Sequence, residues 1–444
     1  MRVIVVGGGI AGLGAAYRLR EAGHQVVLVE KDKEPGGRCR SVQWNGVWAV
    51  TGALAFLGAE TNLVEQARKL GIYEPDALSD LTAAHSWSVL VKREKVVEFG
   101  EFNLLNAARN SFIPLTEKAR LLVAIPALVK QIVAGDPRDI TSSVEFDHVN
   151  ACEYFRRYSP AFVDYFLEPC MGLFCGYGED DFSLAWLLWG ASGRLAWANH
   201  VWSFKERGAG RITWELGQFF AQDSGTDYRL GHHVHAVYHD AEAVSIVTKC
   251  GDRHETISGD ALVMAVPGTR VSAIMPELDA MRRSFFQGIE YSGHHIAYFL
   301  LDRPKGSLPT SYALPAADGF RRTGNFRFVD LGNGRTLAHS QWKDWGCRRH
   351  ADATDDELLD IAWGDLVDVL PELAGTSVAD RFISRQHEAI CKRPKGYIGR
   401  IKAFRDLGRL DRVAFCGDYL TNSTVGQSHW SGLAAAEDLM ARYG

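Results

Sequence analysis

Three glycines close to the N-terminus have a spacing that is typical of nucleotide-binding turns. Gly7, Gly9 and Gly12 fill the G-x-G-x-x-G positions between a β-branched run, residues 2–6, and a helical pattern, residues 13–21. The first glycine permits a tight turn, the second lets the backbone approach a pyrophosphate, and the third lets the helix pack closely on the strand. The N-terminus of that helix offers N–H groups to phosphate. This pattern predicts a dinucleotide site.

The residues that follow specify the dinucleotide further. A second β-branched run, residues 25–29, ends at Glu30, where a carboxylate can accept both hydroxyls of an adenosine ribose. An acid in this place disfavours a 2′-phosphate, so we expect no NADP here. Gly36 and Gly37 permit another close backbone approach, and Arg38 supplies a charge-assisted donor to an anion.

The end of the chain carries a second glycine-rich motif. A buried strand pattern, residues 412–416, runs into Gly417 and Asp418. The segment G-Q-S-H-W-S-G, residues 426–432, then leads into a predicted helix over residues 433–442. Together with the G-G-R turn, this arrangement resembles the FAD fingerprint of the superfamily of flavin amine oxidases, protoporphyrinogen oxidases and phytoene desaturases.

The resemblance implies a set of FAD contacts. In that family the G-G-R residues wrap the pyrophosphate, and a strand valine, here Val234, brings its backbone to the adenine. The Gly-Asp pair meets the pyrophosphate and the ribityl chain. The W-S-G residues lie at a helix N-terminus that faces the flavin, where negative charge collects on reduction. The expected cofactor-binding residues are therefore Gly7, Gly9, Gly12, Glu30, Gly36, Gly37, Arg38, Val234, Gly417, Asp418, Trp430, Ser431 and Gly432.

Two departures from the family pattern bear on the substrate. Amine-oxidising members resemble one another in a lysine that holds a water at the flavin N5 and in a pair of aromatics that sandwich the amine. The strand expected to carry the lysine, residues 291–298, has none, and Leu433 stands where an aromatic would follow W-S-G. These departures favour the protoporphyrinogen oxidase-like branch, in which the flavin takes hydride from an apolar substrate.

Three residues are catalytic candidates. His294 or His295 could take the place of the lysine as a base or water holder, since histidine titrates near neutrality, although strand alternation lets only one of them face the flavin. Trp430 is the third, from the motif that faces the flavin. We expect no metal site, because the histidines between residues 232 and 239 lie on or beside a strand that the FAD motif already uses. Cys391 lacks the aromatic that accompanies covalent attachment in monoamine oxidases, so noncovalent FAD is expected.

The function predicted is that of an FAD-dependent oxidoreductase, an oxidase or dehydrogenase. It would take hydride from a hydrophobic, ring-containing small molecule to flavin N5 and be reoxidised by dioxygen or another acceptor. Trp186, Trp189 and Trp197 could wall a flat substrate, although core packing explains them equally well. No second G-x-G-x-x-G indicates a nicotinamide domain. Three alternatives stay open: a flavin amine oxidase, a flavin-dependent isomerase or mutase without net redox chemistry, and a flavin-free binding protein of the Rab escort or GDP-dissociation-inhibitor type.

These motifs imply an α/β protein with a discontinuous Rossmann-like FAD-binding domain and a mixed α+β substrate-binding domain. The FAD-binding domain is expected over residues 1–58, 208–292 and 385–444, and the substrate-binding domain over residues 59–207 and 293–384. Within the second, start signals predict a helix from Thr116 to about residue 133, and the pattern predicts another over 355–370.

Composition limits the classes of partner. The chain has 444 residues, a net charge of −5 and 46% hydrophobic residues, which excludes a disordered chain and gives no basic footprint for nucleic acid. Eight scattered cysteines without a CxxC pair are typical of free thiols in a reducing compartment. Because no signal peptide or long apolar run is evident, we expect a cytoplasmic protein without a transmembrane span. A peripheral contact with a membrane and a homodimer both stay open.

Overall fold

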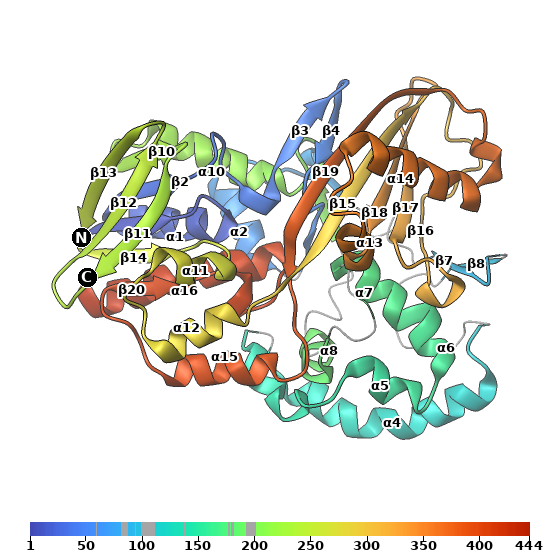
Figure 1. The fold of residues 1–444 in the computed structure, drawn as a ribbon, viewed down its shortest axis with the longest axis horizontal. Coiled ribbons are helices and arrows are strands. Elements are labelled where there is room, and N and C mark those ends of the chain that lie inside the picture. Colours follow the sequence, from blue (N-terminus) through green and yellow to red (C-terminus); the bar gives the residue numbers. More distant parts are fainter. Residues whose placement is uncertain are drawn as a thin grey trace. The chain divides into compact units, whose positions relative to one another are not determined.

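The computed structural model describes residues 1–58, 60–80, 88–93, 95–98, 112–136, 138–175, 178, 182–191 and 201–444 (Figure 1). It divides the chain into two compact units. Unit 1 comprises Met1–Ser79, Trp202–Glu290 and Gly399–Gly444, and unit 2 comprises Asp80–Val201 and Tyr291–Ile398. Each unit is therefore assembled from segments that are far apart in the sequence.

Unit 1 is built on a parallel five-stranded sheet in the order β10-β2-β1-β14-β20. Its strands are β1 (Arg2–Val6), β2 (Gln25–Glu30), β10 (Thr226–Leu230), β14 (Ala261–Met264) and β20 (Val413–Phe415). The central strands are continuous apolar runs, as expected for a parallel sheet that is covered on both faces. The β-α-β start and the α/β class predicted from the sequence are confirmed.

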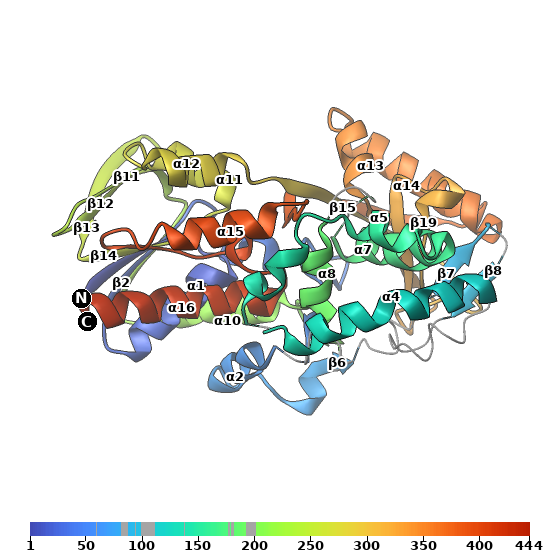
Figure 2. The ribbon, with the colours of Figure 1, turned by 90° about the horizontal axis from the view of Figure 1, so that it is seen from below.

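The helices of unit 1 are α1 (Ile10–Glu21), α2 (Thr61–Lys69), α10 (Gly210–Gln222), α11 (Gly268–Ile274), α12 (Ala280–Gln287), α15 (Tyr397–Asp406) and α16 (Val425–Tyr443). Of these, α1, α10 and α16 pack against the five-stranded sheet. Helices α1 and α16 run side by side in both views (Figures 1 and 2). Val3 and Val5 of β1 pack into one apolar core with Leu13 of α1, Leu216 of α10 and Leu439 of α16.

Smaller sheets complete unit 1. The antiparallel order β11-β12-β13 joins β11 (His233–His239), β12 (Val244–Cys250) and β13 (Arg253–Gly259), while β3 (Ser41–Trp44) pairs with β4 (Val47–Val50). A further sheet has the order β5-β9-β6, from β5 (Phe56–Leu57), β9 (Val201–Phe204) and β6 (Leu78–Asp80). The predicted adenine strand thus exists as β11.

Unit 2 contains a seven-stranded sheet in the order β19-β15-β18-β17-β16-β7-β8. Its strands are β7 (Ser88–Val91), β8 (Lys95–Glu98), β15 (Tyr291–Leu301), β16 (Ser311–Ala313), β17 (Thr323–Asp330), β18 (Thr336–Trp342) and β19 (Val378–Cys391). Its helices are α4 (Leu115–Ala134), α5 (Ala151–Arg156), α6 (Pro160–Phe162), α7 (Glu168–Cys175), α8 (Leu184–Ala191), α13 (Asp344–Arg349) and α14 (Asp355–Val369).

The apolar core of unit 2 lies between its sheet and α14. Phe299 and Ala297 of β15 and Trp342 of β18 pack there with Leu358 and Leu366 of α14. The helices predicted from residue 116 and over residues 355–370 agree closely with α4 and α14. The boundary predicted at residue 385 falls inside β19, which is one continuous strand, and the division between the units lies at Ile398 instead.

Candidate functional site

The first glycine turn of unit 1 has a geometry that only glycine permits. Gly7 has a φ of +109°, and its N–H donates to the Val29 carbonyl at 2.8 Å. A Cβ on Gly12 would lie 1.9 Å from the Gly7 oxygen, so a side chain there would separate α1 from the turn. A Cβ on Gly9, by contrast, would meet no atom within 4 Å. The space over Gly9 is therefore open.

The start of α1 faces that open space. Gly9 is the N-cap of α1, and no side chain caps the helix. The first amides of an α-helix have no carbonyl partner within the helix, and they carry the positive end of its dipole. The combination of an uncapped helix start and an open glycine suits a phosphate group.

Glu30 lies at the end of β2, beside this turn, and its side chain is buried. Its Oε2 accepts a hydrogen bond from the Gly8 N–H at 2.6 Å, and its Oε1 accepts one from the Asp32 N–H at 2.9 Å. A carboxylate has about four acceptor positions, so both oxygens keep capacity for further donors such as hydroxyl groups. The two backbone contacts fix the orientation of the carboxylate.

The second glycine turn lies directly on the first. Gly36 and Gly37 have φ values of +111° and +52°. The Gly36 N–H donates to the Gly8 carbonyl at 2.7 Å, and Gly36 also bridges to Gly9. The two motifs, which are separate in the sequence, therefore form one backbone cradle.

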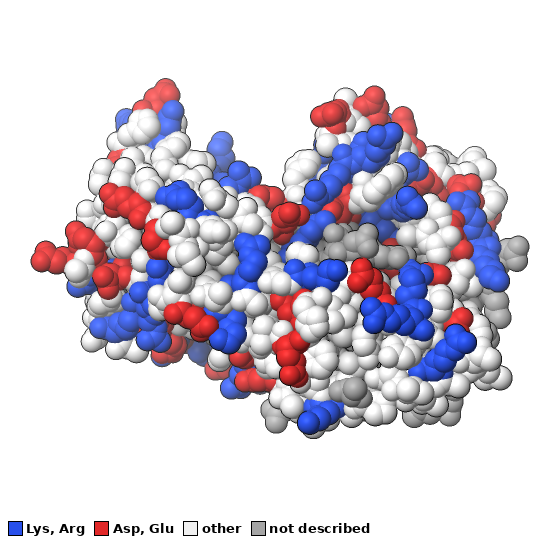
Figure 3. Space-filling model, turned by 60° about the horizontal axis from the view of Figure 1, so that its bottom comes forward, with Lys and Arg blue, Asp and Glu red and all other residues white. Residues whose placement is uncertain are grey.

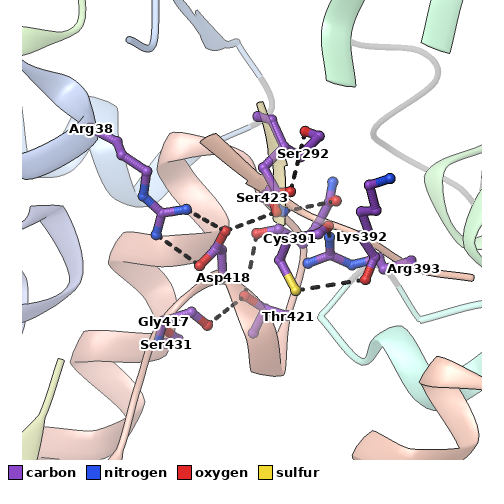
Figure 4. Close-up of polar contacts among 12 residues, drawn as sticks. Arg38, Ser292, Cys391, Lys392, Arg393, Gly417, Asp418, Thr421, Ser423 and Ser431 are labelled. Carbon is purple, nitrogen blue, oxygen red and sulfur yellow. Dashed lines mark hydrogen bonds and ion pairs between the residues drawn. The ribbon is translucent and has the colours of Figure 1, made fainter. Parts of the chain in front are cut away.

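Arg38 joins this cradle to the C-terminal motif (Figure 4). Its Nη1 and Nη2 atoms donate to the two carboxylate oxygens of Asp418 at 2.8 and 2.9 Å. The Oδ2 atom of Asp418 also accepts from the Ser423 hydroxyl at 3.0 Å. Gly417, with a φ of +143°, donates its N–H to the Ser431 Oγ at 2.8 Å. The G-G-R turn and the Gly-Asp turn are thus held together by side chains of unit 1.

The position of the W-S-G residues differs from the prediction. The sequence pattern predicts a helix start at residue 433, but α16 begins at Val425, so Trp430, Ser431 and Gly432 lie inside the helix. Gly432 allows close packing of α16 on α1, since a Cβ there would be 2.0 Å from the Ala11 oxygen. The helix N-terminus lies instead at Thr424, whose side chain accepts from the Gln427 N–H.

A residue that sequence analysis missed lies at this N-terminus. Glu60 is buried, and its Oε2 accepts from the Leu57 N–H at 3.0 Å. Its side chain lies against Gly426, where a Cβ would be 2.5 Å from the Glu60 Cβ. Burial raises the pKa of the Glu60 carboxyl, and hydrogen bonds from Thr424 and the first amides of α16 act in the opposite direction. No motif marks this acid, because its partners at the start of α16, Thr424 among them, lie more than 360 positions away in the sequence.

Val234 is a buried residue of β11. The segment just before β11 returns to the end of β2, where the His232 N–H donates to the Glu30 carbonyl at 2.9 Å. The predicted adenine-contacting residue is therefore two positions from a backbone contact with the predicted ribose-binding acid.

The two candidate histidines lie in unit 2 and point to opposite faces of β15. His295 is fully buried beside Trp342 and His387, with ring centroids 6.1 and 5.5 Å away, on the face that carries Ala297 and Phe299 to the core. His294 points to the opposite face of β15. Burial lowers the pKa of both imidazoles to about 4, so both are neutral at pH 7 and are weaker bases than their ordinary value suggests.

Unit 2 also contains two buried ion pairs that no sequence motif indicated. The Lys343 Nζ donates to the Glu168 Oε1 at 2.6 Å and to the Leu314 carbonyl at 2.9 Å. The neighbouring Asp344 accepts from the Gly293 N–H at 2.7 Å and pairs with Lys392 at 2.6 Å. Lys343 and Asp344 directly follow β18, a strand of mixed polar and apolar residues that is buried along its whole length.

The remaining candidates of unit 2 are packed side chains. The Cys391 Sγ is buried 3.2 Å from the Tyr397 hydroxyl. Trp189 is buried and donates its indole N–H to the Asp136 carbonyl at 3.1 Å, and Trp186 is buried against Phe182. Trp197 lies outside the described residues. Packing within unit 2 thus accounts for the two described tryptophans.

Two negative findings apply to the described part of the chain. No group of three or more His, Cys, Asp and Glu side chains there is arranged to hold a metal ion. None of its helices combines the length and the apolar character that crossing a membrane requires.

Comparisons with known proteins fit this geometry. The family model for flavin-containing amine oxidoreductases matches residues 10–440. A stretch of 184 residues is 26% identical to the mitochondrial protoporphyrinogen oxidase of Nicotiana tabacum, and it covers 41% of this chain and 34% of that protein. The chain therefore spans about a third of the length of that curated relative.

Solved structures with low sequence identity share the fold over the whole chain. A putrescine oxidase bound to putrescine superimposes with a TM-score of 0.75 at 16% identity, over 100% of both chains. Cyclohexylamine oxidase from Brevibacterium oxydans superimposes with a TM-score of 0.74 at 17% identity, over 99% of both. With the family match over nearly all of its length, this chain belongs to the flavin-containing amine oxidoreductase family.

Proposed function

We propose that unit 1 binds FAD noncovalently and that the chain oxidises a hydrophobic, ring-containing small molecule by hydride transfer to the flavin. The observation that carries this proposal is the continuous cradle of glycine turns, closed by the Arg38–Asp418 pair and bordered by Glu30. A Cβ at Gly9 would enter open space, which is the property expected where a ligand approaches the backbone.

The residues of the cradle suit the separate parts of FAD. Glu30 would accept the ribose hydroxyls, and the first amides of α1, together with Arg38, would hold the pyrophosphate. Asp418 would accept from the ribityl chain while it keeps Arg38 in place. When bound, FAD supplies a hydride acceptor at N5, and the protein contributes binding, orientation and exclusion of water.

The environment of Cys391 supports noncovalent binding. Its thiol is buried and engaged with Tyr397, and burial raises the pKa of that tyrosine well above its ordinary value. Acid precipitation tests this part of the proposal. The yellow chromophore should be released into the supernatant, and colour that stays in the pellet would contradict noncovalent binding.

A substitution of Glu30 tests the ribose contact. We expect Glu30→Ala to weaken FAD binding by about tenfold or more, because charge-assisted hydrogen bonds of about 1.5–3 kcal/mol are lost. Turnover of the fraction that retains flavin should change little. A variant with full flavin occupancy and lost turnover would contradict this assignment.

The substrate class rests on Leu433 and on β15. A leucine offers shape and a dry surface, but no ring face to steer an amine nitrogen, and β15 contains no lysine. Apolar ring compounds should therefore gain more from burial, at about 25 cal/mol per Å², than small primary amines can gain from a specific contact.

Anaerobic reduction of the purified holoprotein tests the whole proposal. Hydrophobic ring compounds should bleach the flavin absorbance, while simple alkyl and aryl amines should give no appreciable reduction. Rapid bleaching by a small amine would instead indicate a flavin amine oxidase. Bound flavin that converts a substrate without net reduction would indicate an isomerase, and a colourless protein that takes up no FAD would indicate a binding protein. Leu433→Tyr is the matched variant, because it places an aromatic ring directly after W-S-G. It should increase whatever reduction of the flavin simple amines produce.

A further inference from the structure

Helix α4 of unit 2 has an unusual concentration of exposed apolar side chains. Five large ones on this helix are at least 41% exposed: Leu115 (81%), Leu122 (69%), Val123 (75%), Val129 (41%) and Val133 (78%). Soluble surfaces normally scatter such residues singly, and a contiguous apolar patch marks an interaction surface.

The five side chains form one stripe along α4. At 3.6 residues per turn, they fall within an arc of roughly 120° along the whole helix. The opposite side of α4 anchors it in unit 2, since Ala124 and Leu128 are buried there and the Gln131 side chain donates to the Ser142 carbonyl at 2.9 Å. The helix therefore has two apolar sides, and the described residues cover only one of them.

Positive charges border the exposed stripe. Lys118 lies along one edge and Arg120 lies beyond the other, while Lys130 falls inside the stripe, close to the Arg120 side. The single acid of the helix, Glu117, turns its Oε2 toward unit 2, where it accepts from the Ser159 hydroxyl at 2.7 Å and the Ala161 N–H at 3.0 Å. In Figure 3, which brings the bottom of Figure 1 forward, the surface over α4 is mostly white with scattered blue and little red.

We propose that the exposed face of α4 docks this protein on an anionic membrane surface. The helix has 20 residues and is roughly 30 Å long, so it can lie in the headgroup plane with its apolar stripe buried and its cations against lipid phosphates. It does not span the bilayer, because no described helix is apolar enough for that. The negative headgroups of lipids beside α4 would neutralise the positive charges of Arg120 and Lys130.

Charge favours this occupant over a second copy of the chain. Two copies packed through α4 would bring the same cations together across the symmetry axis without an exposed acid of α4 to pair with them. The proposal is independent of the flavin chemistry, because no residue of α4 belongs to the cradle in unit 1.

Co-sedimentation of the full chain with vesicles tests the proposal. The chain should bind vesicles of phosphatidylcholine that contain about a third phosphatidylserine, and bind pure phosphatidylcholine about tenfold more weakly. Leu122→Asp combined with Val133→Asp should lower the partition coefficient by about tenfold or more. The matched control is Met281→Asp, an equally exposed apolar residue on α12 of unit 1, which should bind like the unmodified chain.

A second pair of variants tests the charges. Arg120→Gln with Lys130→Gln should remove most of the preference for phosphatidylserine, while Lys402→Gln on α15 should keep it. The melting temperature of each variant shows that it is folded, as expected for exposed positions.

Three results would overturn the proposal. They are a chain that binds neither vesicle, binding that survives the Leu122 and Val133 substitutions, and a chain that is dimeric in sedimentation velocity and becomes monomeric when those residues are changed. The last result would assign the stripe to a second copy.

Discussion

The guanidinium of Arg38 and the carboxylate of Asp418 form a bidentate pair across 380 positions of sequence. Asp418 is almost completely buried, with 3% of its side chain exposed, while Arg38 is 31% exposed. A buried carboxylate without a cation is costly, so each residue depends on the other. The pair also joins the N-terminal glycine cradle to the turn that is hydrogen-bonded to α16.

A double-mutant cycle on this pair should give a coupling free energy of about 1–3 kcal/mol in urea unfolding. Arg38→Leu alone strands the buried carboxylate, so it should destabilise the chain more than Asp418→Asn with Arg38→Leu together. Flavin binding should weaken in all three variants, because the two turns lose their connection. Equilibrium unfolding monitored by circular dichroism measures the four corners of the cycle.

The matched control for this cycle is Arg18–Glu437, an ion pair of unit 1 whose side chains are 33% and 55% exposed. Exposed pairs contribute about 0–1 kcal/mol. Equal coupling for the two pairs would mean that Arg38 and Asp418 act as an ordinary surface pair, and the structural role given to them would be wrong.

Two glycines of the same motif should respond in opposite ways to alanine. Gly9→Ala places a methyl in open space at an ordinary φ of −78°, so the flavin-free chain should keep its stability within about 1 kcal/mol. The same methyl would occupy the space in which we propose that the pyrophosphate lies, so FAD affinity should fall at least about tenfold. Titration of FAD fluorescence measures that affinity.

Gly12→Ala is the comparison. Its Cβ would lie 1.9 Å from the Gly7 oxygen, so α1 must move and the flavin-free chain should lose at least about 2 kcal/mol of stability. If Gly9→Ala destabilises the chain as much as Gly12→Ala while FAD binding is spared, the open space over Gly9 is not a binding surface.

The sequence was informative where a local steric requirement selects one residue type. The glycine turn after β1, the acid at the end of β2 and the β-α-β order follow from such requirements, and the structure contains all three elements. Their ligand contacts stay predictions. The start of α16 was missed, although Thr424 and Gln427 have the spacing of a helix cap.

Contacts between distant segments could not be predicted in the same way. Nothing local indicates that Arg38 meets Asp418, that Glu60 lies at the start of α16, or that Lys343 meets Glu168, since each pair depends on the packing of separate elements. Strand alternation correctly predicted that His294 and His295 point to opposite faces. Which face holds the core depends on the position of α14, which a single strand does not reveal.

Lys343 and Glu168 should stabilise unit 2 together, as an ion pair. Both side chains are buried, with 3% and 2% exposed, and Glu168 also accepts the Ala316 N–H at 3.0 Å. Lys343→Met leaves a buried carboxylate unpaired and should cost about 3–5 kcal/mol, whereas Lys343→Met with Glu168→Gln should recover part of that loss. Urea unfolding measures both.

Lys402→Met on α15 is the matched control, because its partner Asp406 and Lys402 itself are both more than half exposed. It should change stability by less than about 0.5 kcal/mol. A Lys343→Met chain as stable as the Lys402→Met chain would contradict the stabilising role given to the buried Lys343–Glu168 pair.

The last prediction concerns acid stability and His429, a buried residue of α16. Burial lowers the pKa of its imidazole to about 4 from an ordinary 6.5, and the charge of Lys69 acts in the same direction. The unfolded chain therefore takes up a proton near pH 6.5, whereas the folded chain does not until about pH 4. Since the unfolded state binds more protons in this window, the unfolding free energy should decrease as the pH falls, by about 1.4 kcal/mol per pH unit for each such histidine. His294 and His295 act in the same direction.

His429→Asn isolates one of these contributions. Asparagine keeps an oxygen near the position of Nδ1, which is 3.0 Å from the Asn62 Nδ2, but it does not take up a proton. The slope of unfolding free energy against pH between 4.5 and 6.5 should therefore decrease by about one proton relative to the unmodified chain. Glu60, whose pKa burial raises, opposes the histidines in both chains, so the difference between the slopes is the relevant measurement. Equal slopes for the His429→Asn chain and the unmodified chain would mean that His429 gains its proton in the folded state as easily as in water, against the burial that the structure shows.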